Sequence, residues 1–286
     1  MSAHAPPVAG CLYVVATPIG NRDDLSARAI DTLRRADRIA CEDTRHSAPL
    51  LALVGAGAPA VALHEHNEAQ AAAGLVERML GGERIALISD AGTPLVSDPG
   101  YRLVQAAIAA GVRVVPIPGP SAPIAALSVS GLASDRFSFE GFLPTKSGAR
   151  REVFEALVDA TRTLIFFEAK HRIVESLADA VAVFGGERRA AIARELTKLH
   201  ETLLRGTLAE LQVCVAADPE QQLGEFVLLI AGADRDMVTA RKEREAITLA
   251  RRLATEMSAS RAAKLAAEIS GASKNALYRA LTESTP

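Results

Sequence analysis

The sequence predicts an α/β protein with two α/β domains and a small all-helical domain with a helix-turn-helix outline at its C-terminal end. Three observations support this fold class. Patterns of buried strands alternate with amphipathic helical patterns through the first 130 residues. The sequence pattern changes near 131–137, and a second set of alternating strands and helices follows. No strand pattern occurs after about 235. We therefore expect domains at 1–131, 132–234 and 235–286.

The first domain alternates strand and helix in a regular order. The expected strands are 12–17, 38–42, 60–64, 84–89 and 113–117. The expected helices are 24–35, 46–53, 68–80 and 99–110. This order predicts a largely parallel sheet with helices on its faces. The segment PGPSAP at 118–123 then leads into an apolar helix.

The second domain repeats the alternation, and the third is helical throughout. Expected strands of the second domain are 137–144, 163–169, 190–197 and 225–232, and expected helices are 149–160, 171–184 and 207–216. In the tail, Ser258 or Ser260 is expected to cap a helix, and SGAS supplies a turn before another. This is a helix-turn-helix outline, and a plain helical hairpin packed on the body fits the pattern equally well.

Composition limits the class of protein. Apolar residues make up 49% of the chain, which is ample for packed cores, while aromatic residues make up only 4%. The three cysteines are far apart, which argues against zinc and disulfides and fits a reducing cytoplasm. His64 and His66 alternate on one strand without a third ligand, so we expect no metal. We also expect no signal peptide and no membrane span, and hence a cytoplasmic protein.

The charge is unevenly distributed. From Asp234 to Pro286 there are ten Lys or Arg and seven Asp or Glu, a net charge of +3. Since the whole chain carries −2, the remainder carries −5. A basic tail on a mildly acidic body indicates a polyanionic partner only weakly, because a solvated helical surface has the same composition.

Four loops leave the carboxyl ends of the expected first-domain strands, at 16–21, 41–45, 90–100 and 116–123. Such loops converge at one edge of a parallel sheet, where open α/β folds bind ligands. The loop DAGTPLVSDPG has far more turn-forming residues than one turn needs, which indicates a long, stiff wall. Three of the four loops are rich in glycine and proline, so we expect a ligand site at this edge of the sheet.

The usual nucleotide fingerprints are missing. The chain has no GxxxxGK[ST], and no GxGxxG follows its first strand. The GxG in LVGAGAP follows a helix, where it is typical of a helix C-cap. ATP hydrolysis and hydride transfer therefore have little support.

Two clusters of Glu, Lys and His follow expected strands of the second domain. They are FFEAKHR at 166–172 and ELTKLHE at 195–201. A single such cluster is usually surface charge. Two from neighbouring strands, facing the first-domain crevice, would favour a functional role.

Eight segments together resemble the tetrapyrrole methylase (class III methyltransferase) superfamily. They are VATPIGNRDDLSARA, CEDTRHS, SDAGTPLVSDPG, PIPGPSA, FEGFLP, FFEAKHR, ARELTKLHE and GEFVLLI. They occur in consistent order from about 12 to 232, and the tail is similar to a helix-turn-helix module of one group. Corrin and porphyrin methylases usually carry a GDP-type turn after the fourth strand. The turn here is DAGTP, which favours the RNA-modifying branch.

This resemblance implies an S-adenosylmethionine-dependent enzyme that methylates the ribose 2′-oxygen of a cytidine in the decoding region of 16S ribosomal RNA. It also implies a homodimer, a small ribosomal subunit or its RNA as partner, and a cofactor cleft between the two α/β domains. The implied cofactor contacts are Ile19, Asp90, Gly92, Thr93, Pro94, Val96, Gly119, Ser121, Ala122 and Phe167, with Ala193 and Leu223 less certain.

A ribose hydroxyl is a weak acid, so a nearby base or cation would help its methylation. Candidate catalytic residues are Glu42, Asp43, Asp98, Glu168, Lys198 and His200, and the sequence does not rank them. Candidate RNA contacts are Lys146, Arg150, Arg151, Arg261, Lys264, Lys274 and Arg279.

Two alternatives share parts of this pattern. A corrin or porphyrin C-methyltransferase would share the fold and the cofactor but would not need a basic helical tail. A non-enzymatic helix-turn-helix regulator that binds nucleic acid would use the tail but leave the first-domain loops unexplained.

Overall fold

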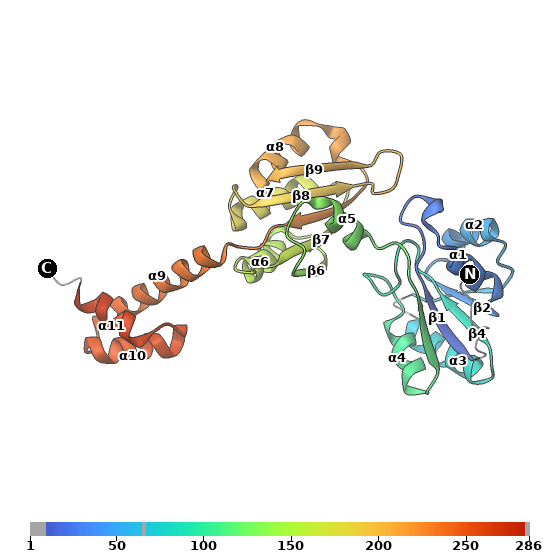
Figure 1. The fold of residues 1–286 in the computed structure, drawn as a ribbon, viewed down its shortest axis with the longest axis horizontal. Coiled ribbons are helices and arrows are strands. Elements are labelled where there is room, and N and C mark those ends of the chain that lie inside the picture. Colours follow the sequence, from blue (N-terminus) through green and yellow to red (C-terminus); the bar gives the residue numbers. More distant parts are fainter. Residues whose placement is uncertain (1–9, 65–66, 284–286) are drawn as a thin grey trace.

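Two five-stranded sheets and a helical tail follow one another along the molecule, with the tail at the end away from the first sheet (Figure 1). The computed structural model describes residues 10–64 and 67–283. His66, which was expected to share a strand face with His64, lies outside the described residues. Within the described ranges, no helix is long and apolar enough to cross a membrane.

The first sheet is wholly parallel, as the alternating pattern predicted. Its strand order is β3-β2-β4-β1-β5. The strands are β1 (Cys11–Val15), β2 (Arg38–Cys41), β3 (Ala60–Ala62), β4 (Arg84–Leu87) and β5 (Arg113–Ile117). Their carboxyl ends meet at one edge, so the loops that follow them are brought together.

Helices cover both faces of the first sheet. They are α1 (Ala27–Arg35), α2 (Thr44–Val54), α3 (Glu68–Leu80) and α4 (Tyr101–Ala109), with a short 3₁₀ turn, η1 (Arg22–Asp24), before α1. The apolar stripes of α1 and α2 pack on one face of the strands. Those of α3 and α4 pack on the other. The GxG segment behaves as expected, because Gly55 ends α2 with a φ of 70°.

Helix α4 begins two residues later than predicted, and its start has an unexpected cap. Its N-cap residue is Gly100, which has no side chain to accept a hydrogen bond. The buried carboxylate of Glu68 accepts hydrogen bonds from the backbone N–H groups of Gly100 (3.0 Å) and Arg102 (2.7 Å). A residue 32 positions away in sequence therefore satisfies this helix end, which no local pattern could indicate.

The second sheet is mixed, with the order β6-β7-β10-β8-β9. Its strands are β6 (Phe137–Phe142), β7 (Thr163–Ala169), β8 (Arg189–Arg194), β9 (Thr202–Thr207) and β10 (Glu225–Ile230). Only β6 and β7 pair in parallel; the other pairs are antiparallel. One face is covered by α6 (Ser147–Leu157), α7 (Ile173–Phe184) and α8 (Leu208–Ala217), and the 3₁₀ turn η2 (Pro219–Gln222) follows α8.

Three expectations for this half of the chain were wrong. The strand expected at 190–197 ends at Arg194, because Glu195 and Thr197 take φ values of 51° and 65°. Strand β9 was not anticipated. Strands β7 and β8 are not neighbours, since β10 lies between them. Both are antiparallel to β10, so their carboxyl ends still share one edge.

Helix α5 (Ala122–Ser130) packs on the other face of the second sheet, where Ala126 and Leu127 contact Ile165, Ala191 and Val227. This helix therefore packs with the second sheet, although it precedes the expected boundary at 131/132. The chain crosses between the two α/β bodies at 118–121, through PGPS. The second expected boundary coincides with the start of the tail helix at Arg235.

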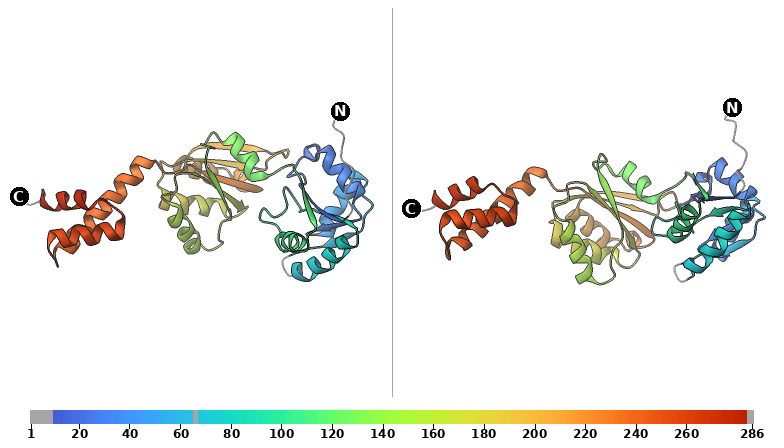
Figure 2. Two further views of the ribbon diagram at one scale, coloured as in Figure 1. Left: turned by 60° about the horizontal axis from the view of Figure 1, so that its bottom comes forward. Right: turned by 90° about the horizontal axis from the view of Figure 1, so that it is seen from below.

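The tail consists of α9 (Arg235–Ala254), α10 (Ala259–Ser270) and α11 (Lys274–Thr282), which share a small alanine- and leucine-rich core. Gly271, with a φ of 73°, ends α10, and the Ser273 side chain caps α11, as the SGAS turn predicted. The views in Figure 2 show α10 and α11 standing off the second sheet, with α9 as the connection. The tail's core is formed by its own helices.

Candidate active site

A cavity of about 590 Å³ lies between the two α/β bodies. Its first-domain wall comes from three of the four expected loops, at 16–21, 90–100 and 116–123. The loop at 41–45 contributes no lining residue, because the β4 loop lies between the end of β2 and the cavity. The opposite wall comes from the carboxyl ends of β6, β7 and β8 and from the start of β10.

Most of the expected cofactor contacts line this cavity. They are Ile19, Asp90, Gly92, Thr93, Val96, Ser121, Ala122 and Phe167, together with Ala193. Pro94, Gly119 and Leu223 are not among the lining residues. Gly119 instead allows close packing, because a Cβ there would lie 3.0 Å from Ala16 Cβ. Pro94 is buried within its loop.

The loop at 90–100 is held in one shape by backbone pairing and unusual dihedral angles. Gly92 exchanges two hydrogen bonds with Thr17, at 2.8 and 3.2 Å, and has a φ of 82°. Leu95 and Ser97 also have positive φ values, of 74° and 66°. Such angles are costly for residues with a Cβ and occur where the surrounding structure imposes them. The many turn-forming residues therefore build a rigid wall, as the sequence predicted.

Glycine is required at 92 for space as well as for dihedral angle. A Cβ at this position would lie 3.2 Å from Ile19 Cγ2, and Ile19 itself lines the cavity. The neighbouring Thr93 donates a 2.9 Å hydrogen bond to the carbonyl of Pro120 and so ties the 90–100 loop to the PGPSAP loop. Backbone amides of this wall can therefore approach a ligand closely.

Asp98 is the most unusual acid in the cavity wall. Burial, and then the negative charge of Glu42, raise its pKa to about 7, and a hydrogen bond with Ser89 opposes them. A carboxyl that titrates near neutral pH can take up a proton during a reaction. Glu42 itself does not line the cavity; its charge acts on Asp98.

Asp43 has a structural role. It is the N-cap of α2, where its carboxylate accepts a 2.8 Å hydrogen bond from the Arg45 backbone N–H. Its pKa is lowered by the hydrogen bonds from Arg45. Asp43 lies outside the cavity lining, and its own N–H is directed at the Asp90 carboxylate, 3.4 Å away.

Glu168 lines the cavity but is fully engaged with other side chains. Its buried carboxylate accepts a hydrogen bond from Ser176 and forms a 2.6 Å ion pair with Arg172. The same Arg172 donates a 3.0 Å hydrogen bond to Thr145 in the loop after β6. Glu168 therefore fixes the loops that follow β6 and β7 to one another.

Lys198 reaches the cavity between two carboxylates. Its Nζ lies 3.0 Å from Glu195 and 2.9 Å from Glu225. Burial alone would lower its pKa, but these two partners outweigh that effect and raise the pKa of Lys198. His200 lies on the exposed part of the same loop, outside the lining. The ELTKLHE and FFEAKHR clusters thus both reach the cavity, through the expected Glu168 and Lys198 but not through His200.

The loop that carries Lys198 also touches the first domain. The Asn21 backbone N–H donates a 3.0 Å hydrogen bond to Thr197 Oγ1. A Cβ at Gly20 would lie 2.5 Å from Lys198 Cγ. Only glycine fits this crossing, so the two α/β bodies meet closely beside the cavity.

Phe142, Lys170 and Glu195 also line the cavity, although sequence reasoning named none of them individually. For Phe142 the available signal was the glycine in FSFEGF, since an isolated glycine in a strand pattern often marks a bulge. For Lys170 and Glu195 the signal was the FFEAKHR and ELTKLHE clusters, but the position of the Glu195 carboxylate depends on β10, where the Glu225 backbone N–H donates to it a 2.8 Å hydrogen bond.

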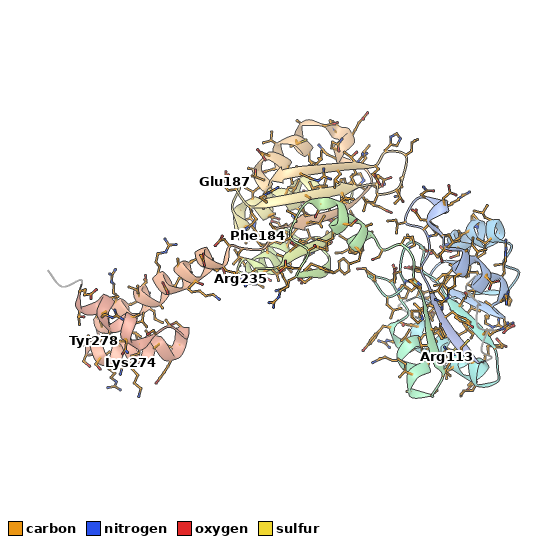
Figure 3. All side chains as sticks on the ribbon, viewed as in Figure 1. Arg113, Phe184, Glu187, Arg235, Lys274 and Tyr278 are labelled. Carbon is orange, nitrogen blue, oxygen red and sulfur yellow. The ribbon has the colours of Figure 1, made fainter. Side chains whose placement is uncertain are left out.

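The expected RNA contacts divide into exposed and buried side chains. Lys146, Arg261, Lys264, Lys274 and Arg279 are exposed, and Arg151 is half exposed. Figure 3 shows Lys274 on the tail, at the far end of the molecule from the first domain. Arg150 is fully buried and forms a 2.6 Å ion pair with Asp179, so its assignment to the RNA path was wrong. A charged residue in a basic loop is expected on the surface, and only the packing of α6 on α7 shows otherwise.

The cavity fits S-adenosylmethionine by size and chemistry. Its volume is within the range of small-molecule sites. Apolar side chains such as Val96 and Phe167 suit the adenine ring and the methionine chain, and Asp90 suits a cationic group. Among residues 10–64 and 67–283, no group of three or more His, Cys, Asp and Glu could hold a metal ion.

Two family models match the chain. One, described as Tetrapyrrole (Corrin/Porphyrin) Methylases, matches residues 11–212. The other, described as RsmI C-terminal HTH domain, matches residues 240–284. Together they cover the first α/β body, most of the second and most of the tail.

Curated relatives match over nearly the whole chain. A ribosomal RNA small subunit methyltransferase I from Xylella fastidiosa is 55% identical, over 94% of this chain and 98% of that protein. One from Pseudomonas aeruginosa is 54% identical, over 95% of this chain and 96% of that protein. One from Escherichia coli O157:H7 is 48% identical, over 94% of each.

Solved structures support the fold. The methyltransferase CobJ matches with a TM-score of 0.59 and 18% identity, over 79% of this chain and 95% of that one. A uroporphyrin-III-C-methyltransferase from Thermus thermophilus matches with a TM-score of 0.53 and 20% identity, over 78% of this chain and 94% of that one. At such identities the likeness concerns the arrangement of elements alone.

Proposed function

Because this chain belongs to the tetrapyrrole (corrin/porphyrin) methylase family of S-adenosylmethionine-dependent enzymes, we propose that it methylates the ribose 2′-oxygen of a cytidine in the decoding region of 16S ribosomal RNA. The observation that carries this proposal is the 48–55% identity, over almost the full length, to proteins named ribosomal RNA small subunit methyltransferase I. The cavity and the basic tail are consistent with such a reaction.

The first-domain loops would hold the cofactor, which supplies an activated methyl group when bound. Gly92 and Thr93 present backbone at a fixed position, and Ile19 supplies an apolar surface beside them. Since these loops are already ordered, little conformational entropy is lost on binding. Phe167 faces them from the second sheet.

Asp98 is the residue we propose for accepting the 2′-hydroxyl proton. It lies in the cavity wall, and its pKa of about 7 makes it partly ionised at neutral pH. Methylation of the 2′-oxygen would exchange the S–CH3 bond of the cofactor for an O–CH3 bond, leave a neutral thioether and break the O–H bond, so the hydroxyl proton needs an acceptor. Glu168 and Lys198 are less suited, because ion pairs already occupy them.

The RNA would approach from the second domain and the tail. Lys146 and Arg151 lie near the β6 and β7 loops, and the tail adds the exposed cations Arg261, Lys264, Lys274 and Arg279. Phosphate contacts of this kind orient a nucleic acid without reading its sequence. The tail would therefore position a substrate whose reaction occurs in the cavity.

We further propose a cytoplasmic homodimer. Exposed apolar side chains on α5, Ile124 and Val129, offer a surface for a second copy. Sedimentation of the purified chain would test this: a monomer at micromolar concentration would contradict it.

The decisive test of the reaction is mass mapping of 16S RNA from cells that lack this protein. Loss of one cytidine 2′-O-methyl group, restored by the wild-type gene, is expected. Assays of the purified protein with ribosomal subunits, tetrapyrroles and duplex DNA separate the alternatives. Methylation of a tetrapyrrole alone would favour a corrin or porphyrin enzyme. Binding to DNA without any methyl transfer would favour a regulator.

A further inference from the structure

Strand β6 contains a bulge that changes the direction of its last side chain. Phe139 pairs with Ile165 on β7, and Phe142 pairs with Phe167. Between these two pairs β6 advances by three residues, whereas β7 advances by only two. The extra residue is accommodated at Gly141, which has a φ of 76°. Without this bulge the alternation of the strand would place Phe142 on the opposite face.

The bulge places Phe142 in the cavity lining, where one side of its ring packs on Phe167 and the rest is exposed to solvent. Its ring lies 5.2 Å from that of Phe167, which in turn lies 4.8 Å from Phe139. Phe142 nevertheless remains 56% exposed and lines the cavity. A rigidly held aromatic ring that is open on one side is a surface on which another flat ring can stack.

Phe142 and the proposed proton acceptor, Asp98, line the same cavity, and the residues that precede them lie close together. A Cβ built on Gly141 would lie 3.9 Å from Ser97 Oγ, on the first-domain loop. The next residue along that loop is Asp98. A nucleoside with its base on Phe142 can therefore present its ribose towards Asp98, because base and ribose are directly bonded.

Two exposed lysines lie on the loops that follow β6 and β7. Lys170 lines the cavity, and Lys146 lies at the start of α6. Neither forms an ion pair with another residue of the described ranges 10–64 and 67–283. Arg172 holds the two loops that carry them together, through its contacts with Glu168 and Thr145.

We propose that Phe142 is the platform on which the target base of the RNA stacks, and that Lys170 binds a phosphate beside it. This inference rests on the proposed function, since it assigns a subsite to the same reaction. Single-stranded bases are commonly recognised by aromatic stacking together with backbone neutralisation by cations. The combination of an open ring, cations and an adjacent proton acceptor selects a nucleotide rather than an apolar ligand.

The test compares Phe142→Ala with Phe142→Trp and with a matched control, Phe137→Ala. Phe137 lies at the other end of the same strand, is 42% exposed and does not line the cavity. Methyl transfer to small ribosomal subunits and calorimetric binding of S-adenosylmethionine are measured for each purified protein. Thermal unfolding checks that each variant is folded.

Loss of one stacked base is expected to lower kcat/KM for RNA by roughly 5- to 150-fold in Phe142→Ala. Phe142→Trp keeps a stacking ring and should recover most of this loss, whereas Phe137→Ala is expected to stay near wild type. Cofactor affinity should be unchanged in all three. Lys170→Ala should raise KM and reduce the salt dependence of RNA binding.

Two results would overturn the platform. One is wild-type RNA methylation by Phe142→Ala; the other is a loss of cofactor affinity in that variant, which would show that the ring holds the cofactor instead. Failure of the proposed function is distinguishable, because the wild-type protein would then bind S-adenosylmethionine and methylate no RNA.

Discussion

The two walls of the cavity are built on different principles. The first-domain wall is backbone held by glycine, proline and paired loops, and it carries the acids Asp90 and Asp98. The second-domain wall consists of strand ends that carry the rings of Phe142 and Phe167 and the cation of Lys170. Its acids, Glu168, Glu195 and Glu225, are held in ion pairs with Arg172 and Lys198. Rigid backbone with acids suits a small cationic cofactor, whereas open rings and cations suit a polyanion. The comparison indicates that the first-domain wall mainly holds the cofactor, whereas Phe142 and Lys170 on the second-domain wall contact the RNA.

Replacing the proposed proton acceptor tests the first wall most severely. Asp98→Asn is expected to lower kcat by about 10²- to 10⁴-fold while cofactor and RNA affinities stay within a few fold. In the wild type, kcat should rise with pH up to about 7, because only the ionised carboxylate accepts a proton. Initial rates between pH 5.5 and 8.5 measure both effects. A wild-type profile that is flat across this range would exclude Asp98 as the base.

The same variant has an expected effect on stability. The pKa of Asp98 is raised in the folded chain, so between about pH 4 and 7 the folded state keeps a proton that the unfolded state has released. The stabilisation from that proton is lost as the pH rises through 7. The difference between the free energies of unfolding of Asp98→Asn and of the wild type, measured with urea, should therefore shift in favour of the variant as the pH rises from about 4 to 7.

Gly92→Val tests whether backbone shape holds the cofactor. The φ of 82° and the 3.2 Å approach to Ile19 Cγ2 both oppose a branched side chain. Binding of S-adenosylmethionine is expected to weaken by about 100-fold or more, with a nearly unchanged circular dichroism spectrum. Calorimetry without added metal measures it. Global unfolding would instead show that the glycine is structural, and the cofactor role would be withdrawn.

Replacing the exposed cations of the tail tests RNA binding, and the expected effect is smaller than those above. Changing Arg261, Lys264, Lys274 and Arg279 to Ala should weaken RNA binding and spare cofactor affinity. The slope of log K against log salt should decrease by about 0.7–0.9 for each phosphate that the tail no longer neutralises. An unchanged slope would make the tail a packing or dimerisation element and leave Lys146 and Arg151 as the RNA path.

The smallest expected effect concerns the anchor of the first wall. Glu68→Ala leaves the N–H groups of Gly100 and Arg102 without their acceptor, which should lower the free energy of unfolding by about 1–3 kcal/mol. Cofactor affinity should fall by less than about 10-fold, and Glu68→Gln should restore most of it. A larger loss of affinity than of stability would mean that Glu68 shapes the site directly.

The sequence alone determined the features that depend on neighbouring residues. The apolar runs of β1, β2 and β4 and the periodicity of α3 and α10 are local patterns, and they predicted these elements to within a few residues. The stiffness of the 90–100 loop likewise follows from the residues within it. The motifs in their order were also enough to predict the family, because they preserve the same local turns.

Tertiary structure decided whatever depends on contacts between distant residues. The pKa of Asp98 depends on burial and on Glu42, and Arg150 is buried because α6 packs on α7. Helix α5 joins the second sheet through its packing, and Glu68 caps a helix 32 residues away. The direction of Phe142 depends on the register of β6 against β7. A sequence pattern records what a residue prefers, whereas burial, charge and direction come from neighbours that only the folded chain brings together.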